Sequence, residues 1–354
     1  MPNSLLASQD LLKTLPFGGP KAADPALVDS SQWSKITTMK AYPDYRLRVK
    51  SPNLCDTNVT QYTGYLDTAE DKHFFFWFFE ARNQAKTGDT PVILWTNGGP
   101  GCSSLVGVLM ELGPCRVNKG GAGTSHNPYG WNENAHVIFI DQPLNTGFSY
   151  GQRVDNSYDA GKDVNVFLRM FYHLFPKYAS SQLHVFGESY AGHYVPAIGK
   201  AIHETNQVLA KKRQEGTLTK AEESVAVLPL PYTTWGRHNN PYNVNMPSKP
   251  LHLEIPPLLA AGIRVLIYAG DADWICNWYG NKAYAQALVW PGQTGFNQME
   301  DLLWTVDGED AGEVRTHRNL TFIRVFGSGH FVPLDRPKSA LDMINRWVSN
   351  KAFS

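Results

Sequence analysis

A tight strand–turn–helix junction at residues 187–192 constrains the fold more than any other segment of this chain. The sequence there is GESYAG, and it lies between an apolar run at residues 183–186 and a segment with a helical pattern. A G-x-S-x-G sequence in this context is typical of a nucleophile elbow, in which small residues must flank the serine. The turn holds the Ser189 hydroxyl clear of the backbone and leaves the next N–H at the helix start, where it can bind an oxyanion. Ser189 is therefore a candidate nucleophile.

Apolar runs alternate with helical patterns from about residue 90 onward, which predicts an α/β fold. Runs such as residues 91–95 and 265–268 are apolar on both faces, as a central parallel sheet covered by helices requires. The expected strands are residues 61–66, 74–79, 92–96, 136–141, 183–186, 264–269 and 321–326. The expected helices are residues 158–174, 190–212, 258–261 with the residues before them, 277–288 and 338–349.

Two segments lack this rhythm. Residues 1–54 are polar and interrupted by proline, so we expect a leader or propeptide-like segment followed by one domain over residues 55–354. Residues 211–250 are charged and then rich in Pro, Asn and Tyr, which indicates either an excursion over the sheet or a poorly ordered splice. Within this stretch only residues 224–230 have the pattern of a strand.

Composition excludes several classes of function. The net charge is zero, so there is no basic field to attract nucleic acid. No apolar stretch approaches the length of a membrane span, and no signal peptide is visible at the N-terminus. Asn58 and Asn319 lie in glycosylation sequons, which support secretion only weakly. The four cysteines fit no C-x-x-C metal or redox pattern, so we expect no metal and no cofactor; two, one or no disulfides are all compatible with the sequence.

Two later segments supply partners for the serine. A serine hydroxyl needs a base, and the base needs an orienting carboxylate. In doubly wound hydrolases these follow in the order Ser, Asp, His, at the carboxyl ends of strands. Asp271 comes directly after one predicted strand, with Asp273 as a competitor, and His330 lies on a Gly-rich loop after the last one. The expected triad is therefore Ser189, Asp271 and His330.

A Gly-rich run, WTNGGPGCSS at residues 95–104, follows an early strand. It lacks the G-K-[ST] ending of a phosphate loop, so phosphate binding is not expected. Hydrolases of this architecture place their second oxyanion donor in such a loop. The N–H groups of Gly99 and Tyr190 are the candidate donors.

Taken together, these segments resemble the serine carboxypeptidase family, and most closely its carboxypeptidase Y branch. The matching stretches are QYTGYLD, DKHFFFWFFEARN, PVILWTNGGPGCSSLVGVLMELGP, NPYGWNENAHVIFIDQPLNTGFSYG, GESYAGHYVPAIGK, VLIYAGDADWICNWYGNKA and VFGSGHFVPLDRP. The resemblance implies an α/β-hydrolase fold with a mixed, mostly parallel sheet flanked by helices. It implies release of C-terminal residues from peptides through an acyl-enzyme. An acyltransferase, as among the related plant enzymes, and a truncated inactive variant are the alternatives.

The resemblance also implies how the substrate is held. A clamp of Trp95, Asn97, Glu111 and Glu188, with Gly98 beside it, would bind the substrate's C-terminal carboxylate. Cys276 and Phe331 would line the pocket for the residue on the acyl side. Because three crowded carboxyls cannot all be charged, the site must hold extra protons and bind best at acidic pH, which suits a vacuole-like compartment or secretion. The oligomeric state is not predicted.

The chain departs from the family between the nucleophile helix and the aspartate strand. The relatives carry a further strand and a largely helical, disulfide-rich cap there, so we expect the cap to be reduced or absent. Cys102 would lose its usual partner, while Cys55 and Cys115 could pair with each other. Loss of a central strand would leave unpaired edges inside the sheet unless residues 224–230 refill the slot.

Overall fold

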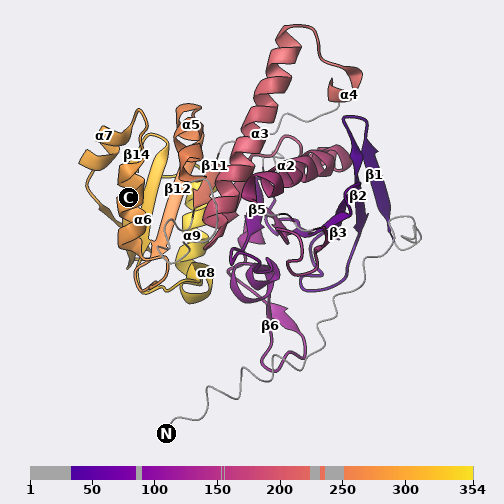
Figure 1. Ribbon diagram of the computed structural model, residues 1–354. Helices are drawn as coiled ribbons and strands as arrows, with labels where there is room; N and C mark the ends of the chain where they lie inside the picture. Colours follow the sequence, from indigo (N-terminus) through magenta and orange to yellow (C-terminus); the bar gives the residue numbers. More distant parts are fainter. Residues whose placement is uncertain are drawn as a thin grey trace, which may run out of the picture. The chain divides into compact units, whose positions relative to one another are not determined.

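The protein is described here by a computed structural model of residues 33–353, apart from residues 85–89, 153, 155, 224–231 and 236–250. Within these residues a single mixed sheet of 13 strands organises the fold, in the order β1-β2-β3-β4-β8-β5-β10-β11-β12-β15-β14-β13, with β9 paired to β4 (Figure 1). The strands are β1 (Lys35–Met39), β2 (Tyr42–Lys50), β3 (Gln61–Thr68), β4 (Lys72–Phe79), β5 (Val92–Thr96), β8 (His136–Ile140), β9 (Tyr150–Gly151), β10 (Leu183–Gly187), β11 (Tyr232–Trp235), β12 (Arg264–Gly270), β13 (Leu302–Val306), β14 (Glu309–His317) and β15 (Leu320–Val325). A separate hairpin is formed by β6 (Cys115–Val117) and β7 (Thr124–His126).

Parallel pairing is confined to the centre of the sheet. The six strands from β8 to β15 in the sheet order pair in parallel, while the strands on both sides of them are antiparallel. The central strands β5, β8 and β10 are buried along their whole length. A central parallel sheet is what the doubly apolar runs predicted, and the whole arrangement is that of an α/β hydrolase, as the family resemblance implied.

Helices cover both faces of the sheet. They are α2 (Ser157–Leu174), α3 (Ala191–Gln214), α4 (Lys220–Glu223), α5 (Ile255–Ala260), α6 (Trp278–Ala287), α7 (Gln293–Gln298), α8 (Val332–Asp335) and α9 (Pro337–Val348), with a one-turn π-helix η3 (Gly107–Glu111). Side chains of β12 alternate between two hydrophobic clusters: Val265 and Ile267 pack with α5 and α6, whereas Leu266 and Tyr268 pack with η3, α8 and α9. None of the described helices is long and apolar enough to span a membrane.

The slot between β10 and β12 is occupied. The four residues of β11 pair in parallel with both neighbours, with Tyr232 opposite His184 on one side and Arg264 on the other. The strand expected at residues 224–230 lies outside the described residues, and the segment that fills the slot is the one that follows it. The sheet is therefore continuous from β1 to β13 despite the short insertion.

The domain begins earlier than the sequence pattern indicated. The segment predicted to be a leader, residues 1–54, contains β1 and β2, which pair with each other. Strand β2 also pairs with β3, from Tyr45 opposite Thr68 to Lys50 opposite Thr63. The compact unit starts at Trp33. The sequence did not predict β2 because the charged residues Asp44, Arg46 and Arg48 interrupt its apolar ones.

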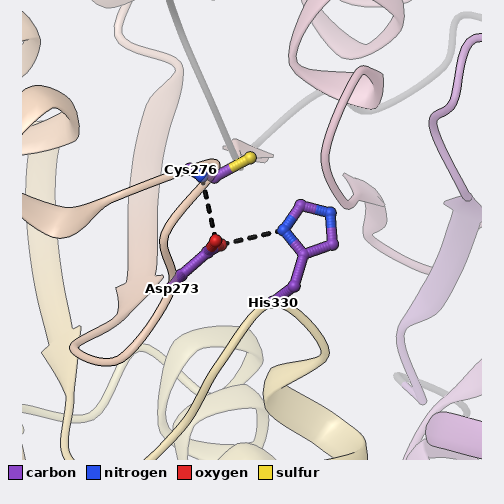
Figure 2. A group of neighbouring side chains, drawn as sticks. All are labelled: Asp273, Cys276 and His330. Carbon is purple, nitrogen blue, oxygen red and sulfur yellow. Dashed lines mark hydrogen bonds and ion pairs between the residues drawn. The ribbon is translucent and has the colours of Figure 1, made fainter. Parts of the chain in front are cut away.

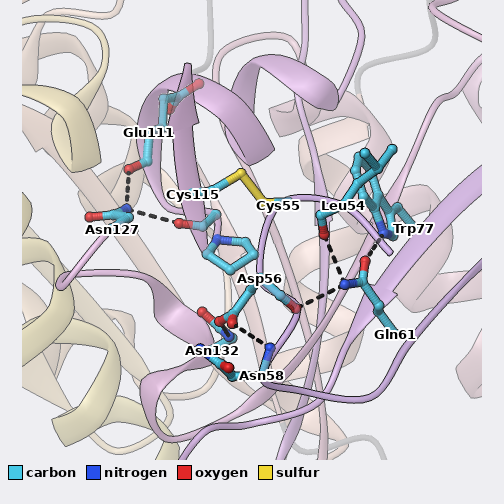
Figure 3. Close-up of a disulfide and its surroundings, with 12 residues drawn as sticks. Leu54, Cys55, Asp56, Asn58, Gln61, Trp77, Glu111, Cys115, Asn127 and Asn132 are labelled. Carbon is cyan, nitrogen blue, oxygen red and sulfur yellow. Dashed lines mark hydrogen bonds between the residues drawn. A yellow bond between two sulfur atoms is a disulfide. The ribbon is translucent and has the colours of Figure 1, made fainter. Parts of the chain in front are cut away.

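A disulfide links the connection between β2 and β3 to strand β6. Cys55 and Cys115 are bonded, with their Cα atoms 5.4 Å apart, which confirms the pairing that the sequence left open (Figure 3). The remaining cysteines are thiols, Cys102 at the surface and Cys276 in the interior. Around the bridge, Gln61 Nε2 donates to the carbonyls of Leu54 and Asp56, both at 2.8 Å. The connection before β3 is therefore fixed to β6, the strand that follows η3 in the chain.

Candidate active site

The junction after β10 is the predicted elbow. Ser189 adopts φ of 60°, in the left-handed region that few residues other than glycine occupy, and α3 begins two residues later. Gly187 is required by crowding, since a Cβ there would lie 2.5 Å from the Ala191 Cβ and 2.7 Å from the Thr96 oxygen. Such a strained turn is typical of a site where one side chain must be presented to a ligand.

A histidine and an aspartate meet beside this elbow. His330 Nδ1 lies 2.9 Å from Asp273 Oδ2. Figure 2 shows the imidazole facing this carboxylate, with Cys276 above it. The other oxygen, Oδ1, accepts the N–H groups of Ile275 and Cys276, both at 2.9 Å. Ser189, Asp273 and His330 line one small cavity. Because Nδ1 is engaged with the carboxylate, Nε2 of the imidazole is left for the serine.

The electrostatics favour an ionised carboxylate at this position. Burial alone would raise the pKa of Asp273, but the hydrogen bonds from His330 and from the backbone N–H of Cys276 outweigh it, so the pKa lies below its ordinary value. A charged Asp273 stabilises the imidazolium that forms when His330 takes a proton.

Asp271, the expected acid, has a different role, and this expectation was wrong. Its Oδ1 accepts the N–H of Gly327 at 2.8 Å, and its Oδ2 lies 3.6 Å from a nitrogen of Arg324. Asp335 similarly accepts the N–H of Gly329 at 2.7 Å. These two carboxylates therefore hold the backbone on the N-terminal side of His330, while Asp273 holds its ring. Asp271 directly follows the strand, but the chain must continue two residues further before a side chain reaches the imidazole.

The Gly-rich loop after β5 lies against the elbow. A Cβ on Gly98 would lie 2.3 Å from the backbone nitrogen of Tyr190, so only glycine permits this approach. Gly99 adopts φ of 108°, again a glycine conformation. The N–H groups of Gly99 and Tyr190, the predicted oxyanion donors, therefore belong to backbone segments in direct contact.

A buried carboxylate anchors the far end of this loop, and the sequence reading did not identify it. Asp141 accepts hydrogen bonds from the Ser103 hydroxyl at 2.8 Å and the Ser104 N–H at 2.7 Å. The Ser104 hydroxyl in turn accepts the N–H of Asn97 at 3.1 Å. The position of Asn97 is thus fixed from the neighbouring strand β8.

The expected clamp residues are connected to one another. Trp95 Nε1 donates to Asn97 Oδ1 at 2.7 Å, and Asn97 Nδ2 donates to Glu111 Oε1 at 3.0 Å. The N–H of Gly107, in η3, also donates to Asn97 Oδ1, at 3.2 Å. A Cβ on Gly107 would lie 2.5 Å from Trp95 Nε1, so glycine is required here as well, which the sequence reading missed.

The clamp contains a pair of buried carboxyls. Glu111 is 1% exposed and Glu188 is 4% exposed. Burial raises the pKa of both groups, and the neighbouring Glu111 charge raises that of Glu188 further, well above its ordinary value. The two groups titrate as a unit, so the pair retains a proton well above the pH at which an ordinary glutamic acid loses it.

Two further predicted residues lie beside the triad. Cys276 is buried and lines the cavity that holds Ser189 and His330. The ring of Phe331 meets that of His330 edge-on at 5.3 Å. Candidate ligand atoms of Asp273, Cys276 and His330 lie within 4.8 Å of one another, a spacing that suits a metal ion, but the aspartate oxygens and His330 Nδ1 are already engaged in hydrogen bonds with each other and the backbone.

The two glycosylation candidates differ in access. Asn58 is exposed, whereas Asn319 is half-buried and donates from Nδ2 to the Leu259 carbonyl at 3.4 Å. Attachment of a sugar requires the side-chain nitrogen, so Asn58 is the better candidate.

Comparison with known proteins gives a consistent family. A sequence model of the serine carboxypeptidase family matches residues 52–216 and 217–350. Carboxypeptidase Y of Candida albicans is 35% identical and that of Komagataella phaffii 33%; each alignment covers 91% of this chain, with 80% and 82% of the relative. Both alignments span 436 positions, more than the 354 residues of this chain, so the relatives carry segments that it lacks. The crystal structure of Kex1Δp, a prohormone-processing carboxypeptidase from Saccharomyces cerevisiae, shares the fold with a TM-score of 0.69 at 22% identity, covering 91% of this chain and 96% of its own.

Proposed function

The chain belongs to the serine carboxypeptidase family, and from that membership we propose that Ser189, His330 and Asp273 cleave the last peptide bond of a substrate through an acyl-enzyme. The chain is a serine-type carboxypeptidase by family, so the proposal concerns which residues act and how. The observation that carries it is the hydrogen bond between His330 Nδ1 and Asp273 beside the strained Ser189.

The reaction proceeds in two halves. His330 Nε2 takes the proton of the Ser189 hydroxyl as Oγ attacks the carbonyl carbon of the last peptide bond. The N–H groups of Gly99 and Tyr190 donate to the oxyanion that forms. The imidazolium gives its proton to the leaving nitrogen, and the C–N bond breaks to release the C-terminal residue. His330 then takes a proton from water as the water oxygen attacks the ester carbon. The imidazolium returns that proton to Ser189 Oγ as the ester C–O bond breaks, which releases the shortened peptide with a new carboxyl end.

Recognition of a free C-terminus is the task of the clamp. Asn97 Nδ2 and the proton that Glu111 and Glu188 share supply donors for the substrate carboxylate, which is itself ionised at all but the lowest pH. As the pH rises and the pair loses its shared proton, repulsion between like charges weakens binding. We therefore propose an acidic pH optimum.

An oxidising and acidic location fits these properties. A disulfide such as Cys55–Cys115 persists in secreted or vacuolar compartments rather than in the cytosol. We propose a vacuolar or secreted enzyme that acts on peptide C-termini and is glycosylated at Asn58.

Active-site labelling tests the assignment directly. A fluorophosphonate probe is expected to label the wild-type chain with one-to-one stoichiometry, and Ser189→Ala is expected to abolish labelling while retaining the thermal unfolding transition. The wild type should release the free C-terminal amino acid from a blocked dipeptide, detected by mass spectrometry, and should act poorly on the matching C-terminal amide. Labelling that persists in Ser189→Ala would remove the serine assignment, and equal turnover of acid and amide would remove the clamp.

A further inference from the structure

A tyrosine that the proposed reaction does not use lies in the active-site cavity. Tyr268 is on β12 and is 4% exposed. Its hydroxyl oxygen is buried and makes no hydrogen bond with any described residue. The cavity is lined by Tyr268 together with Glu188, Ser189 and His330, among others. Because buried polar groups in folded proteins are nearly always hydrogen-bonded, an unpaired hydroxyl at this position requires an explanation.

The ring of Tyr268 lies on the clamp side of the sheet. It packs in the same hydrophobic cluster as Trp95, Val108 and Val332, which come from β5, η3 and α8. Val108 is part of the π-helix that carries Glu111. Tyr268 therefore shares a sheet face with the carboxylate clamp, and it is one of the residues that line the cavity at Ser189 and His330.

The carboxyl pair in the clamp has few donors. Asn97 donates to Glu111 Oε1, and a side-chain hydrogen bond joins Glu111 and Glu188 when one of them is protonated. Their buried Oε2 atoms have no hydrogen bond from any other described side chain. One proton between the two carboxyls relieves their repulsion and still leaves one negative charge in the interior. Such a charge needs a hydrogen-bond donor.

We propose that the Tyr268 hydroxyl is this donor, that it reaches the Glu188 carboxyl through one water molecule held in the cavity, and that it thereby sets the pH range in which the clamp binds a substrate carboxylate. The cavity has a volume of about 20 Å³, enough for a single water. The proposal rests on the carboxylate-reading function proposed for Glu188 and extends it to a positioning residue on β12.

The charged surroundings determine the direction of the effect. The titratable groups that act on the carboxyl pair and on Tyr268 are Asp273, Cys276, Cys102, His330 and Asp335. Burial, followed by the charges of Glu188 and Glu111, raises the pKa of Tyr268 well above its ordinary value, so the hydroxyl keeps its proton and can donate throughout the working range. Donation favours the ionised form of Glu188 and so opposes the rise in its pKa that burial causes.

The test is the pH dependence of KM in Tyr268→Phe. Without the donor, the pair should keep its proton to higher pH, so the pH above which KM rises for a free-acid peptide should increase by about one unit. Near neutral pH the variant is then expected to have a KM up to about tenfold lower than the wild type for the free acid, with much less change in kcat. KM for the matching amide should not shift, because no substrate carboxylate is present. A merely structural tyrosine would change stability, or both substrates together, without moving the midpoint.

Two further variants make the test decisive. Tyr172→Phe removes another buried hydroxyl for which no described partner exists, on α2 among core residues, and should leave the midpoint unchanged. In a Glu188→Gln background, Tyr268→Phe should have no further effect on the pH profile, because the group it acts on no longer titrates. An unshifted midpoint in Tyr268→Phe, or an equal shift in the Glu188→Gln background, would overturn the proposal. If the wild type shows no acid-dependent preference for the free acid, the clamp itself fails, which is a separate result.

Discussion

Replacement of Asp273 by asparagine isolates the orienting carboxylate from the rest of the loop. In the structure Oδ1 of Asp273 accepts two backbone N–H groups and Oδ2 faces His330 Nδ1. An asparagine can keep its oxygen toward the backbone and place its NH₂ toward the imidazole. It then donates to Nδ1, so the ring proton moves to Nε2, and the imidazole can no longer take the Ser189 proton. In the serine-protease triad the equivalent change lowers kcat about 10⁴-fold, roughly 5.5 kcal/mol of transition-state stabilisation, and we expect a loss of that order.

The matched control is Asp271→Asn, two residues earlier. Its amide oxygen can still accept the Gly327 N–H, and only the charge facing Arg324 is lost. Both groups of that ion pair are partly exposed and lie 3.6 Å apart, so the loss should be below about 1 kcal/mol, or roughly fivefold in kcat/KM. The two variants should therefore differ by about three orders of magnitude although each removes one carboxylate.

The assay is hydrolysis of a blocked dipeptide at acidic pH, with the rate of fluorophosphonate labelling as a second measure of serine reactivity. Thermal unfolding monitors folding of both variants. The reasoning is refuted if Asp271→Asn loses the larger factor, or if Asp273→Asn folds normally and retains more than about a tenth of the wild-type kcat. Either result would mean that the acid partner of His330 is chosen by something other than the observed hydrogen bond.

Two predictions concern stability. The Cys55→Ala/Cys115→Ala double variant should lose about 2–4 kcal/mol in the free energy of unfolding, because the disulfide closes a loop with a sequence separation of 60. The control, Cys102→Ser at the surface, should change this free energy by less than about 0.5 kcal/mol. Urea titration without reductant measures both variants, and equal losses would contradict the loop-closure argument. Burial lowers the pKa of His184 to about 3, so the unfolded chain gains a proton that the folded one does not as the pH falls below 6.5, and this should cost about 2 kcal/mol of stability at pH 5. His184→Gln should flatten the acid limb of a plot of unfolding free energy against pH, and an unchanged slope would exclude this residue as its cause.

The sequence predicted the parts of the site that local pattern determines. Ser189 could be identified because its elbow needs a glycine at position 187, and the G-x-S-x-G pattern around it is visible in the chain. His330 could be identified because it alone among the histidines follows a late strand on a Gly-rich loop. The strands β5 and β12 were located to within one residue because buried parallel strands are apolar on both faces.

What the sequence could not provide was the path of the chain after a strand ends. The choice between Asp271 and Asp273 depends on a turn in which the Asp273 carboxylate accepts the N–H groups of Ile275 and Cys276. Aspartate commonly makes such bonds in turns, and this preference was the available signal for Asp273. The outer strands β1, β2, β13 and β14 mix exposed and buried residues without a continuous apolar run, and the sequence did not predict them. Long-range roles such as that of Asp141 depend on contacts between distant segments, which leave no local signal.

The four-residue strand β11 acts as a spacer between two halves of the catalytic machinery. The nucleophile follows β10 on one side of it, and the acid and base follow β12 and β15 on the other. Were β10 and β12 to pair directly, serine and imidazole would be displaced by one interstrand distance, roughly 4.8 Å, which exceeds the length of a hydrogen bond. The length of the connecting chain can thus change greatly among relatives, provided that one strand's width is preserved. In this protein the active-site chemistry therefore requires the segment between β10 and β12 to supply only the width of one strand.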